Sequence, residues 1–316
     1  MADRPDPEPG NGQVRVDLVA AALNRRDWWI RRGGEAELPV VLGSDGAGVV
    51  SALGAGVEGI SPGDEIVIYP GIEWGSEDAV PGPAFEILGV PSQGTYAEQI
   101  VVAAEQVRPK PAGWSWLETA ALPVAGLTAW RSLVRHADAG PARSILVPGA
   151  GGGVGTFAVQ IGAALGARMV ATSSSDEKRE RLRSLGAAAV ADYRDDGWPD
   201  VLGPVDAVVD GVGGGIWPGA FRMLRPGGTL VCFADTVGEI GEVDIRELYF
   251  AHHAIQGTTL GSPREFDALL AHCAEASWRP VIDSVFPLRE AGEAHRRLDA
   301  PDRFGKIVLA IDEVKI

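Results

Sequence analysis

Cysteine, histidine and long apolar runs are all scarce in this 316-residue sequence. It holds two cysteines, Cys232 and Cys273, and five histidines. Two isolated cysteines cannot build a disulfide framework or a CxxC-type metal site, and their scarcity fits a reducing compartment. No run approaches the roughly 20 apolar residues of a membrane helix, and no basic-then-apolar leader opens the chain. We therefore expect a cytoplasmic protein with no membrane partner.

Positive charge is also in short supply. The chain has 28 Lys and Arg against 43 Asp and Glu, a net charge of −15 and a pI near 4.8. Such a surface repels a polyanion unless its basic residues are segregated. The densest basic run, residues 177–183, alternates signs as a solvated helix face does. We expect no nucleic-acid partner.

The sequence is long enough for two domains, and 46% of its residues are hydrophobic. Its first part predicts a mainly β domain, because short Val-rich stretches alternate with turn signals. These stretches cover residues 12–23, 47–54, 64–70 and 94–102. The passage between Tyr69 and Thr95 is rich in proline and glycine, which argues against regular structure there.

From Ser144 onward, apolar strands alternate with helical patterns. The predicted strands cover residues 144–150, 168–174, 188–193, 205–213 and 229–235, and the helices cover 154–167, 175–187 and 217–228. This alternation is typical of right-handed βαβ crossovers and a parallel sheet, so the fold class is α/β. The final strand, residues 305–311, could rejoin the first domain.

A glycine-rich turn joins the first of these strands to its helix. Gly149, Gly152 and Gly155 follow a GxxGxxG spacing, with Gly153 and Val154 at the helix start. Glycine is needed where a Cβ would block the turn, the approach of a phosphate or the helix–strand contact. Free N–H groups at a helix N-terminus suit a pyrophosphate. The turn therefore predicts dinucleotide binding.

The end of the second strand of this region indicates which dinucleotide binds. NAD enzymes usually place a carboxylate there for the ribose 2′-hydroxyl, and that carboxylate would repel a 2′-phosphate. Here Ser173 and Ser174 offer hydroxyl groups, and Lys178 follows one helical turn later. We predict NADP(H). Alternatively, Ser175 or Asp176 simply caps the helix with Lys178 on its solvated face, and both readings can hold together.

Several motifs together give the chain a family resemblance. They are "AALNRRDWWIRRG", "LGSDGAGVV", "GDEIVIYP", "GTYAEQIVV", "ALPVAGLTAW", the glycine turn, "LRPGGTLVCF" and "FGKIVL". In this order they resemble the medium-chain dehydrogenase/reductase superfamily, and within it the zinc-independent quinone oxidoreductase branch. The resemblance implies a GroES-like, mainly β catalytic domain from residues 1–120 and 263–316, and a Rossmann domain with a doubly wound parallel sheet over residues 121–262. It also implies a homodimer through the edges of the Rossmann sheets.

The zinc-binding branch of this superfamily carries a Cys and a Gly-His-Glu where this chain has Asn24 and Ser44-Asp45. Catalytic zinc needs about three Cys, His or carboxylate ligands, so we predict no metal site. Without a Lewis acid, alcohol oxidation is difficult, whereas hydride transfer from NADPH to a quinone or an α,β-unsaturated carbonyl compound is not.

The resemblance also implies the site residues. Asn24 lines the family's cleft, and Asp27 matches an acidic position of related enoyl reductases; Asp27 could equally be a helix N-cap or pair with Arg31. Where some relatives have a proton-donating Tyr, this chain has Trp29, an argument against dedicated enoyl reduction. Lys306 lies either near the cleft or on an exposed strand. The implied cofactor contacts are Thr128, Tyr193, Phe233, Ala234, Leu260 and Gly261.

Together these features predict an NADPH-dependent quinone or enone reductase. One alternative is reduction of 2-alkenals or enoyl thioesters, which a basic patch for CoA or a carrier protein would favour. Another is a dinucleotide-binding regulator that has lost catalysis. Only the regulator should bind NADPH without oxidising it in the presence of quinones or enals.

Overall fold

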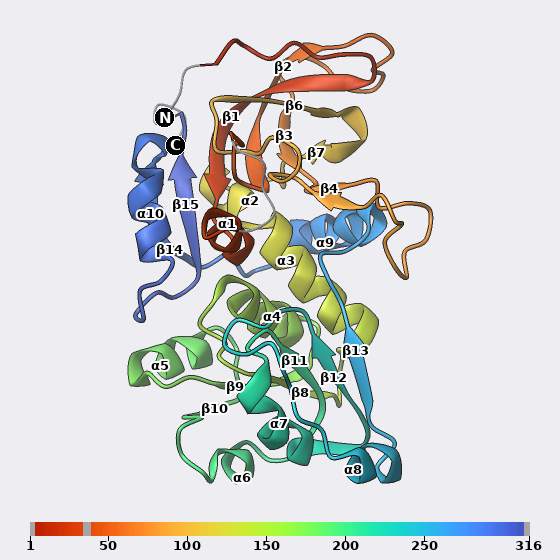
Figure 1. Ribbon diagram of the computed structural model, residues 1–316, viewed down its shortest axis with the longest axis vertical. Coiled ribbons are helices and arrows are strands. Elements are labelled where there is room, and N and C mark those ends of the chain that lie inside the picture. Colours follow the sequence, from red (N-terminus) through yellow and green to blue (C-terminus); the bar gives the residue numbers. More distant parts are fainter. Residues whose placement is uncertain (1–3, 34–38, 313–316) are drawn as a thin grey trace. The chain divides into compact units, whose positions relative to one another are not determined.

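The computed structural model describes residues 4–33 and 39–312, and the chain forms two compact units (Figure 1). The discontinuous unit combines the chain up to Leu127 with the chain from Gly261 onward, and the central unit runs from Thr128 to Leu260. The prediction had placed these divisions at 120/121 and 262/263. Residues 1–3, 34–38 and 313–316 of the predicted catalytic domain lie outside the described residues.

A seven-stranded sheet forms the frame of the discontinuous unit. Its strands are β1 (Gln13–Ala22), β2 (Asp45–Leu53), β3 (Glu65–Ile68), β6 (Gln99–Ala103), β7 (Val107–Pro109), β14 (Ile282–Pro287) and β15 (Lys306–Ala310). The order is β14-β15-β1-β2-β3-β7, and β6 pairs with the first half of β1 while β15 pairs with its second half. The strand from the end of the chain therefore rejoins the first domain.

Short helices complete this unit. They are α1 (Arg25–Arg31), α2 (Trp116–Ala121), α9 (Pro263–Glu275) and α10 (Ala291–Arg297), with 3₁₀ turns at Ala104–Gln106 and Leu288–Glu290. α3 (Pro123–Arg131) begins in the discontinuous unit and ends in the central one. Capping boxes begin α2 at Ser115 and α9 at Ser262, where each serine accepts a hydrogen bond from the N–H of the glutamate three residues on.

The proline-rich passage between Tyr69 and Thr95 is less irregular than its composition suggested. β4 (Gly71–Ile72) pairs antiparallel with β5 (Glu86–Ile87). Between them, the rings of Trp74 and Phe85 meet edge to face with centroids 5.0 Å apart. Aromatic packing between residues distant in sequence supplies the order that turn-forming residues alone did not predict.

Six parallel strands form the sheet of the central unit. They are β8 (Ser144–Val147), β9 (Arg168–Thr172), β10 (Ala189–Ala191), β11 (Val205–Asp210), β12 (Leu224–Cys232) and β13 (Ala254–Gly257). The order β10-β9-β8-β11-β12-β13 reverses between β8 and β11, the doubly wound arrangement of a Rossmann fold. Ligands of such sheets bind beyond the carboxyl ends of the strands at this reversal.

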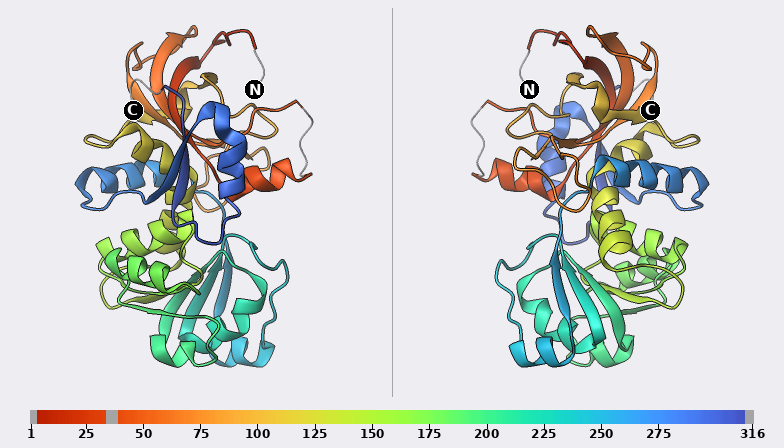
Figure 2. Two further views of the ribbon diagram at one scale, coloured as in Figure 1. Left: turned by 90° about the vertical axis from the view of Figure 1, so that its left-hand side faces the viewer. Right: turned by 90° about the vertical axis from the view of Figure 1, so that its right-hand side faces the viewer.

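Helices cover both faces of the parallel sheet, as Figure 2 shows. They are α4 (Gly153–Ala164), α5 (Asp176–Ser184), α6 (Trp198–Leu202), α7 (Trp217–Met223) and α8 (Ile245–Phe250), with a π-helical turn at Ser132–His136 and a 3₁₀ turn at Gly214–Ile216. None of the helices in the described part of the chain has the length and apolar character to cross a bilayer.

One predicted boundary in this unit is wrong. The helix expected over residues 217–228 ends at Met223, and β12 starts at Leu224, five residues before the predicted strand. Pro226 disfavours a helical conformation at Arg225, so the helix must end before it. Leu224 is already extended (φ −67°, ψ 130°) and pairs with Val205 of β11.

Candidate functional site

A buried polar cluster lies at the start of α1 in the discontinuous unit, and Lys306 is at its centre. The Lys306 ammonium donates to the Leu23 carbonyl (2.7 Å), to Asn24 Oδ1 (2.7 Å) and to Asp45 Oδ2 (2.8 Å). Lys306 is 3% exposed and Asp45 is fully buried. The alternative of an exposed strand lysine is therefore wrong, because β15 directs this side chain into the cluster.

Asp45 is held by groups from three parts of the chain. Besides Lys306, its Oδ2 accepts a hydrogen bond from Asn24 Nδ2 (2.8 Å), and its Oδ1 accepts one from the backbone N–H of Val124 (2.8 Å). A buried carboxylate is tolerated when a cation and hydrogen bonds replace its water. Asn24, predicted as a catalytic residue, is 8% exposed and joins Lys306 to Asp45.

Asp27 lies beside this cluster and is fully buried. It is the third residue of α1, and its carboxylate accepts hydrogen bonds from the N–H of Asn24 (2.8 Å), the N–H of Gly43 (3.3 Å) and the hydroxyl of Tyr96 (2.9 Å). The helix N-cap is Asn24, and no ion pair with Arg31 exists among the described residues. The pairing with Arg31 is therefore wrong, and Asp27 is not the N-cap itself, although its bond to the Asn24 N–H caps the helix from the third position of a capping box.

Burial changes the pKa values of Asp27 and Tyr96. Burial raises the pKa of Asp27 above its ordinary value, and the hydrogen bonds from Asn24 and Tyr96 oppose that rise. Burial also raises the pKa of Tyr96 well above its usual value of 10.0, and the neighbouring Asp27 carboxylate raises it further. The Tyr96 hydroxyl therefore keeps its proton and serves as a donor to Asp27.

Ser44, which precedes Asp45, makes two hydrogen bonds of its own. Ser44 donates its hydroxyl hydrogen to the carbonyl of Leu88 (2.6 Å) and accepts from Arg26 Nη1 (2.8 Å). Within residues 4–33 and 39–312, no three His, Cys, Asp or Glu side chains lie together as metal ligands would. Asn24 and Asp45 thus meet around the Lys306 ammonium, whereas Ser44 is bonded to the Arg26 guanidinium.

The glycine turn connects β8 to α4 in the central unit. Gly149 has a left-handed conformation (φ 55°), and its N–H donates to Thr172 Oγ1 (3.0 Å). A Cβ on Gly155 would lie 2.6 Å from backbone atoms of Ala150, so only glycine allows the helix to approach the strand this closely. Gly152 is the N-cap of α4 and offers no side chain to its N–H groups. The turn therefore fits a dinucleotide pyrophosphate.

The residues predicted to distinguish NADP from NAD follow β9. Ser173 comes directly after the strand and is 5% exposed, and Ser174 follows it. Ser175 is the N-cap of α5 and accepts a hydrogen bond from the N–H of Lys178 (3.3 Å). Tyr193 follows β10 and is 43% exposed. Because carboxyl ends of parallel strands share one edge of the sheet, this set lies at the same edge as the glycine turn.

The other predicted contacts are spread over both units. Phe233 and Ala234 follow β12, and the Phe233 N–H donates to the Asp210 carbonyl (3.0 Å) at the end of β11. Thr128 is 6% exposed in α3, and Leu260 ends the central unit with a positive φ of 23°. Gly261 belongs to the discontinuous unit, where its carbonyl accepts from the Tyr69 hydroxyl (2.8 Å).

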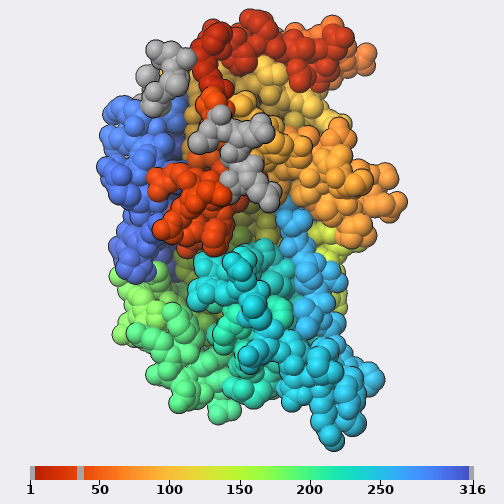
Figure 3. Space-filling model, viewed as in Figure 1, coloured from red at the N-terminus to blue at the C-terminus, as the bar shows by residue number. Residues whose placement is uncertain are grey.

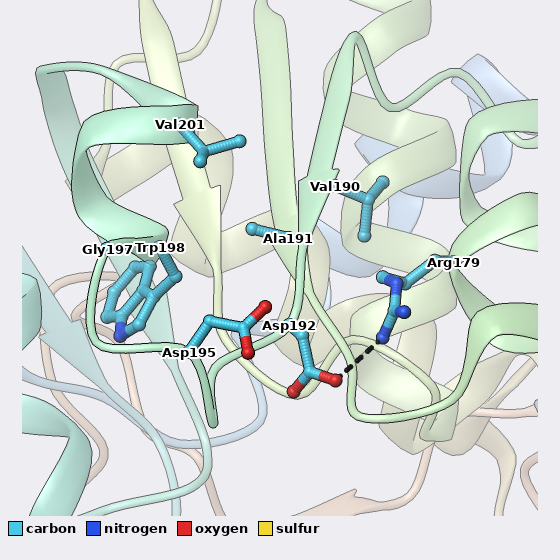
Figure 4. A pocket seen from close by; sticks show the side chains of 8 residues that line it. All are labelled: Arg179, Val190, Ala191, Asp192, Asp195, Gly197, Trp198 and Val201. Carbon is cyan, nitrogen blue, oxygen red and sulfur yellow. Dashed lines mark hydrogen bonds and ion pairs between the residues drawn. The ribbon is translucent and has the colours of Figure 1, made fainter.

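Sequence reasoning missed a group of charged residues at the end of β10. Asp192 accepts hydrogen bonds from Arg179 of α5 (3.0 Å) and from Arg194 (2.6 Å). We call these three residues the Asp192 clasp. A pocket of about 300 Å³ lies beside it (Figure 4), lined by Arg179, Val190, Ala191, Asp192, Asp195, Gly197, Trp198 and Val201. The available signal was the run of charged residues around Tyr193, residues 191–196, "ADYRDD".

Comparison with protein families matches both parts of the chain. The model described as an alcohol dehydrogenase GroES-like domain matches residues 10–112, and the one described as a zinc-binding dehydrogenase matches residues 153–275. The two matches correspond to the discontinuous and central units.

Similar curated proteins span most of the chain. The zinc-type alcohol dehydrogenase-like protein YogA of Leptosphaeria maculans is 33% identical, covering 96% of this chain and 92% of its own length. Crotonyl-CoA reductase of Streptomyces avermitilis is 30% identical, covering 94% and 79%. A 2-methylene-furan-3-one reductase of Solanum lycopersicum is 37% identical, covering 73% and 57%.

Solved structures repeat the fold closely. A crystal structure of an NAD-dependent alcohol dehydrogenase has a TM-score of 0.93 and 38% identity, covering 98% of this chain and 95% of its own. The crotonyl-CoA carboxylase/reductase AntE in complex with NADP has a TM-score of 0.86 and 26% identity, covering 96% and 88%. These likenesses and the two family models agree on one architecture.

Proposed function

This chain belongs to the medium-chain dehydrogenase/reductase superfamily, and we propose that it is an NADPH-dependent reductase of quinones or α,β-unsaturated carbonyl compounds. The superfamily makes it an oxidoreductase. Relatives described as crotonyl-CoA and 2-methylene-furan-3-one reductases act, by their names, on compounds with a carbon–carbon double bond conjugated to a carbonyl group. The choice of substrate class rests on the buried polar cluster.

The donor chemistry of this cluster carries the proposal. Zinc prefers thiolate, imidazole and carboxylate ligands, whereas Asn24, Ser44 and Asp45 supply one amide, one hydroxyl and one carboxylate. The single carboxylate is already bonded to the Lys306 ammonium at 2.8 Å. These residues do not fit a zinc ion. A reaction whose substrate carries its own electron-accepting carbonyl is therefore the chemistry that they favour.

The cofactor of the proposed enzyme is NADP(H). The glycine turn fits its pyrophosphate. Positions 173 and 174 carry serine, so no carboxylate there binds the ribose 2′-hydroxyl of NAD or repels the 2′-phosphate of NADP. Lys178, one turn into α5, brings a positive charge to the same end of the sheet. The similar AntE structure is in complex with NADP whereas the similar alcohol dehydrogenase is described as NAD-dependent, so the choice over NAD rests on the residues after β9. When bound, NADPH supplies the hydride.

In this proposal, the residues of the discontinuous unit position the substrate rather than activate it chemically. Asp27 is fully buried, so its role is to orient the Tyr96 hydroxyl, which donates a hydrogen bond to it at 2.9 Å. Asn24 uses one amide N–H for Asp45, and among the described residues nothing accepts its second N–H. We assign that second N–H to the substrate carbonyl. A quinol anion is a weak base and collects its protons from water.

Reduction of 2-alkenals or enoyl thioesters is the second candidate, because one of the similar proteins above is described as a crotonyl-CoA reductase and another as a crotonyl-CoA carboxylase/reductase. A CoA substrate carries several phosphate groups and requires a basic surface. The net charge of −15 opposes such a surface. A regulator without activity is the third candidate, and it predicts NADPH binding without NADPH oxidation.

The deciding experiment is a steady-state panel. NADPH and NADH oxidation is followed with 1,4-benzoquinone, 9,10-phenanthrenequinone, 2-hexenal and crotonyl-CoA, with and without a chelator, and bound metal is measured in parallel. We expect quinone reduction with NADPH, the same rate with chelator, and less than about one metal ion per ten chains. Stoichiometric zinc with chelator-sensitive alcohol oxidation would overturn the proposal. Turnover of 2-hexenal or crotonyl-CoA without quinone turnover would select the second candidate, and no turnover the third.

We also propose a homodimer formed through the edge of the parallel sheet, in the cytoplasm. β13 is the last strand of this sheet, and all four of its residues are exposed. Large apolar side chains gather in the same part of the chain, namely Val237, Ile240, Ile245, Tyr249, Phe250 and Ile255. The segment that contains them lies at the surface in Figure 3. An edge strand beside such a surface is a template for pairing with a second copy.

Light scattering after gel filtration tests the dimer. Ile255→Asp on β13 should convert a dimer to a monomer because it places a charge in the interface. Val285→Asp is the matched control. Val285 is 42% exposed on β14, the edge strand of the other sheet, and Ile255 is 41% exposed on β13, so both changes add a charge to a similarly exposed edge residue. A wild-type monomer, or equal effects of the two variants, would contradict the proposed interface.

A further inference from the structure

The Asp192 clasp places an exposed guanidinium, that of Arg194, next to the residues that follow β9. Arg194 Nε donates to Asp192 Oδ1 (3.0 Å), and its Nη2 donates to Asp192 Oδ2 (2.6 Å), so one edge of the fork is fixed on the carboxylate. The same Nη2 donates to the Ser174 carbonyl (2.6 Å). The clasp therefore ties the loop after β10 to the loop after β9.

The other arginine of the clasp is largely buried. Arg179 donates through Nη1 to the Ser173 carbonyl (2.8 Å) and to Asp192 (3.0 Å), and it pairs through Nη2 with Asp176. Its side chain is 16% exposed. Figure 4 shows this guanidinium directed at Asp192. These contacts and its burial give Arg179 the role of holding the clasp.

Arg194 is the exposed arginine of the clasp. Its side chain is 63% exposed, and among the described residues nothing accepts a hydrogen bond from its Nη1. The Asp192 hydrogen bonds raise the pKa of Arg194 and hold that of Asp192 far below its usual range, so both stay charged at any physiological pH. A charged planar donor whose Nε and Nη2 are fixed and whose Nη1 is open is pre-organised to bind a phosphate oxygen.

We propose that Arg194, oriented by Asp192, binds the adenosine 2′-phosphate of NADP(H) together with Lys178. This inference rests on the proposed cofactor and adds a specificity-determining residue to it. Asp192 follows β10 rather than β9, and two guanidinium groups neutralise it, so it does not repel the phosphate as a carboxylate at the end of β9 would. Asp192 is thus a positioning residue and Arg194 the contact.

Calorimetric titration with adenosine nucleotides tests the proposal without any turnover. The probes are 2′,5′-ADP, which carries the 2′-phosphate, and 5′-AMP, which lacks it. Arg194→Gln should weaken 2′,5′-ADP binding about tenfold, the value of one charge-assisted hydrogen-bonded contact, and leave 5′-AMP binding unchanged. Arg194→Lys keeps the charge but cannot form the fork, so it should lose part of the affinity.

Arg183→Gln is the matched control. Arg183 lies on α5, is 47% exposed and pairs with Glu180, so its removal changes the net charge equally. It should alter neither titration. Unchanged 2′,5′-ADP affinity in Arg194→Gln, while Lys178→Gln is weakened, would overturn the role of Arg194 and leave the cofactor assignment standing. Equal loss for both nucleotides would overturn it too. A wild-type protein that does not prefer 2′,5′-ADP would instead overturn the cofactor assignment.

Discussion

Two carboxylate–cation pairs in this molecule have similar contact distances and opposite surroundings. Lys306 and Asp45 meet at 2.8 Å in the discontinuous unit with side chains 3% and 0% exposed. Arg194 and Asp192 meet at 2.6 Å in the central unit with side chains 63% and 10% exposed. All three N–H groups of the buried cation are bonded to protein atoms, whereas the Nη1 of the exposed cation has no acceptor among the described residues. Burial makes the first pair a structural element, and exposure leaves the second able to bind a ligand.

The two pairs should also differ in what they contribute to stability. Removing one partner of a buried pair leaves an uncompensated charge without water, which costs several kcal/mol. Removing one partner of an exposed pair costs little, because solvent replaces the lost interaction. Although the two contact distances are similar, loss of the pair should reduce stability more in the discontinuous unit than in the central unit.

The largest expected effect comes from breaking the buried pair. Lys306→Met should lower the free energy of unfolding by about 3–5 kcal/mol, because Asp45 is left buried without its cation. Urea denaturation measures the change. Lys110→Met is the control, since Lys110 pairs at 3.1 Å with Glu65, whose side chain is 57% exposed, and it should cost at most about 1 kcal/mol. The double variant Asp45→Asn/Lys306→Met should recover part of the loss. Equal losses of stability in Lys306→Met and Lys110→Met would mean that burial does not increase the contribution of the Lys306–Asp45 pair.

A second change tests whether backbone shape, rather than charge, builds the site of the central unit. Gly155→Ala puts a Cβ 2.6 Å from the backbone of Ala150, so α4 must shift away from β8. We expect a loss of about 1–3 kcal/mol in unfolding free energy and, with the N–H groups displaced, weaker NADP+ binding by calorimetry.

Gly140→Ala is the matched control for this change, because a Cβ there meets no atom within 4 Å and its φ is not positive. It should leave both the unfolding free energy and the NADP+ affinity within error of the wild type. If Gly155→Ala bound NADP+ as tightly as Gly140→Ala, the close approach of helix to strand would have no part in cofactor binding.

Local patterns predicted the central unit better than the discontinuous one. The glycine turn and the alternation of strands and helices are encoded within short stretches, and the family and fold comparisons confirm the α/β class and the superfamily. The helix predicted through residue 228 was wrong, because Pro226 prevents the helix from continuing past Met223. The family resemblance offered a place near the cleft as one of two alternatives for Lys306, but the contacts of Lys306 and Tyr96 could not be predicted. Lys306 binds Asn24 across a separation of 282 residues, and no local pattern encodes such a contact.

The smallest effect compares a buried histidine of the discontinuous unit with an exposed one of the central unit. Burial, helped by the positive charge of Arg31, lowers the pKa of His295 to about 4. An unfolded histidine titrates near 6.5, so the unfolded state binds more protons between these values and stability falls as pH falls. The titration of His295 should lower the free energy of unfolding by about 1 kcal/mol between pH 7 and pH 5.5.

His295→Gln should therefore flatten the pH dependence of the unfolding free energy by about that amount, because glutamine does not titrate. His252→Asn is the control: His252 is exposed with a φ of 55°, a conformation that asparagine tolerates, so its removal should leave the slope unchanged. Urea titrations at pH 7.0, 6.0 and 5.5 measure all three proteins. Parallel curves for wild type and His295→Gln would mean that His295 titrates alike in the folded and unfolded chain. The contrast between buried and exposed polar groups would then be confined to the charged pairs.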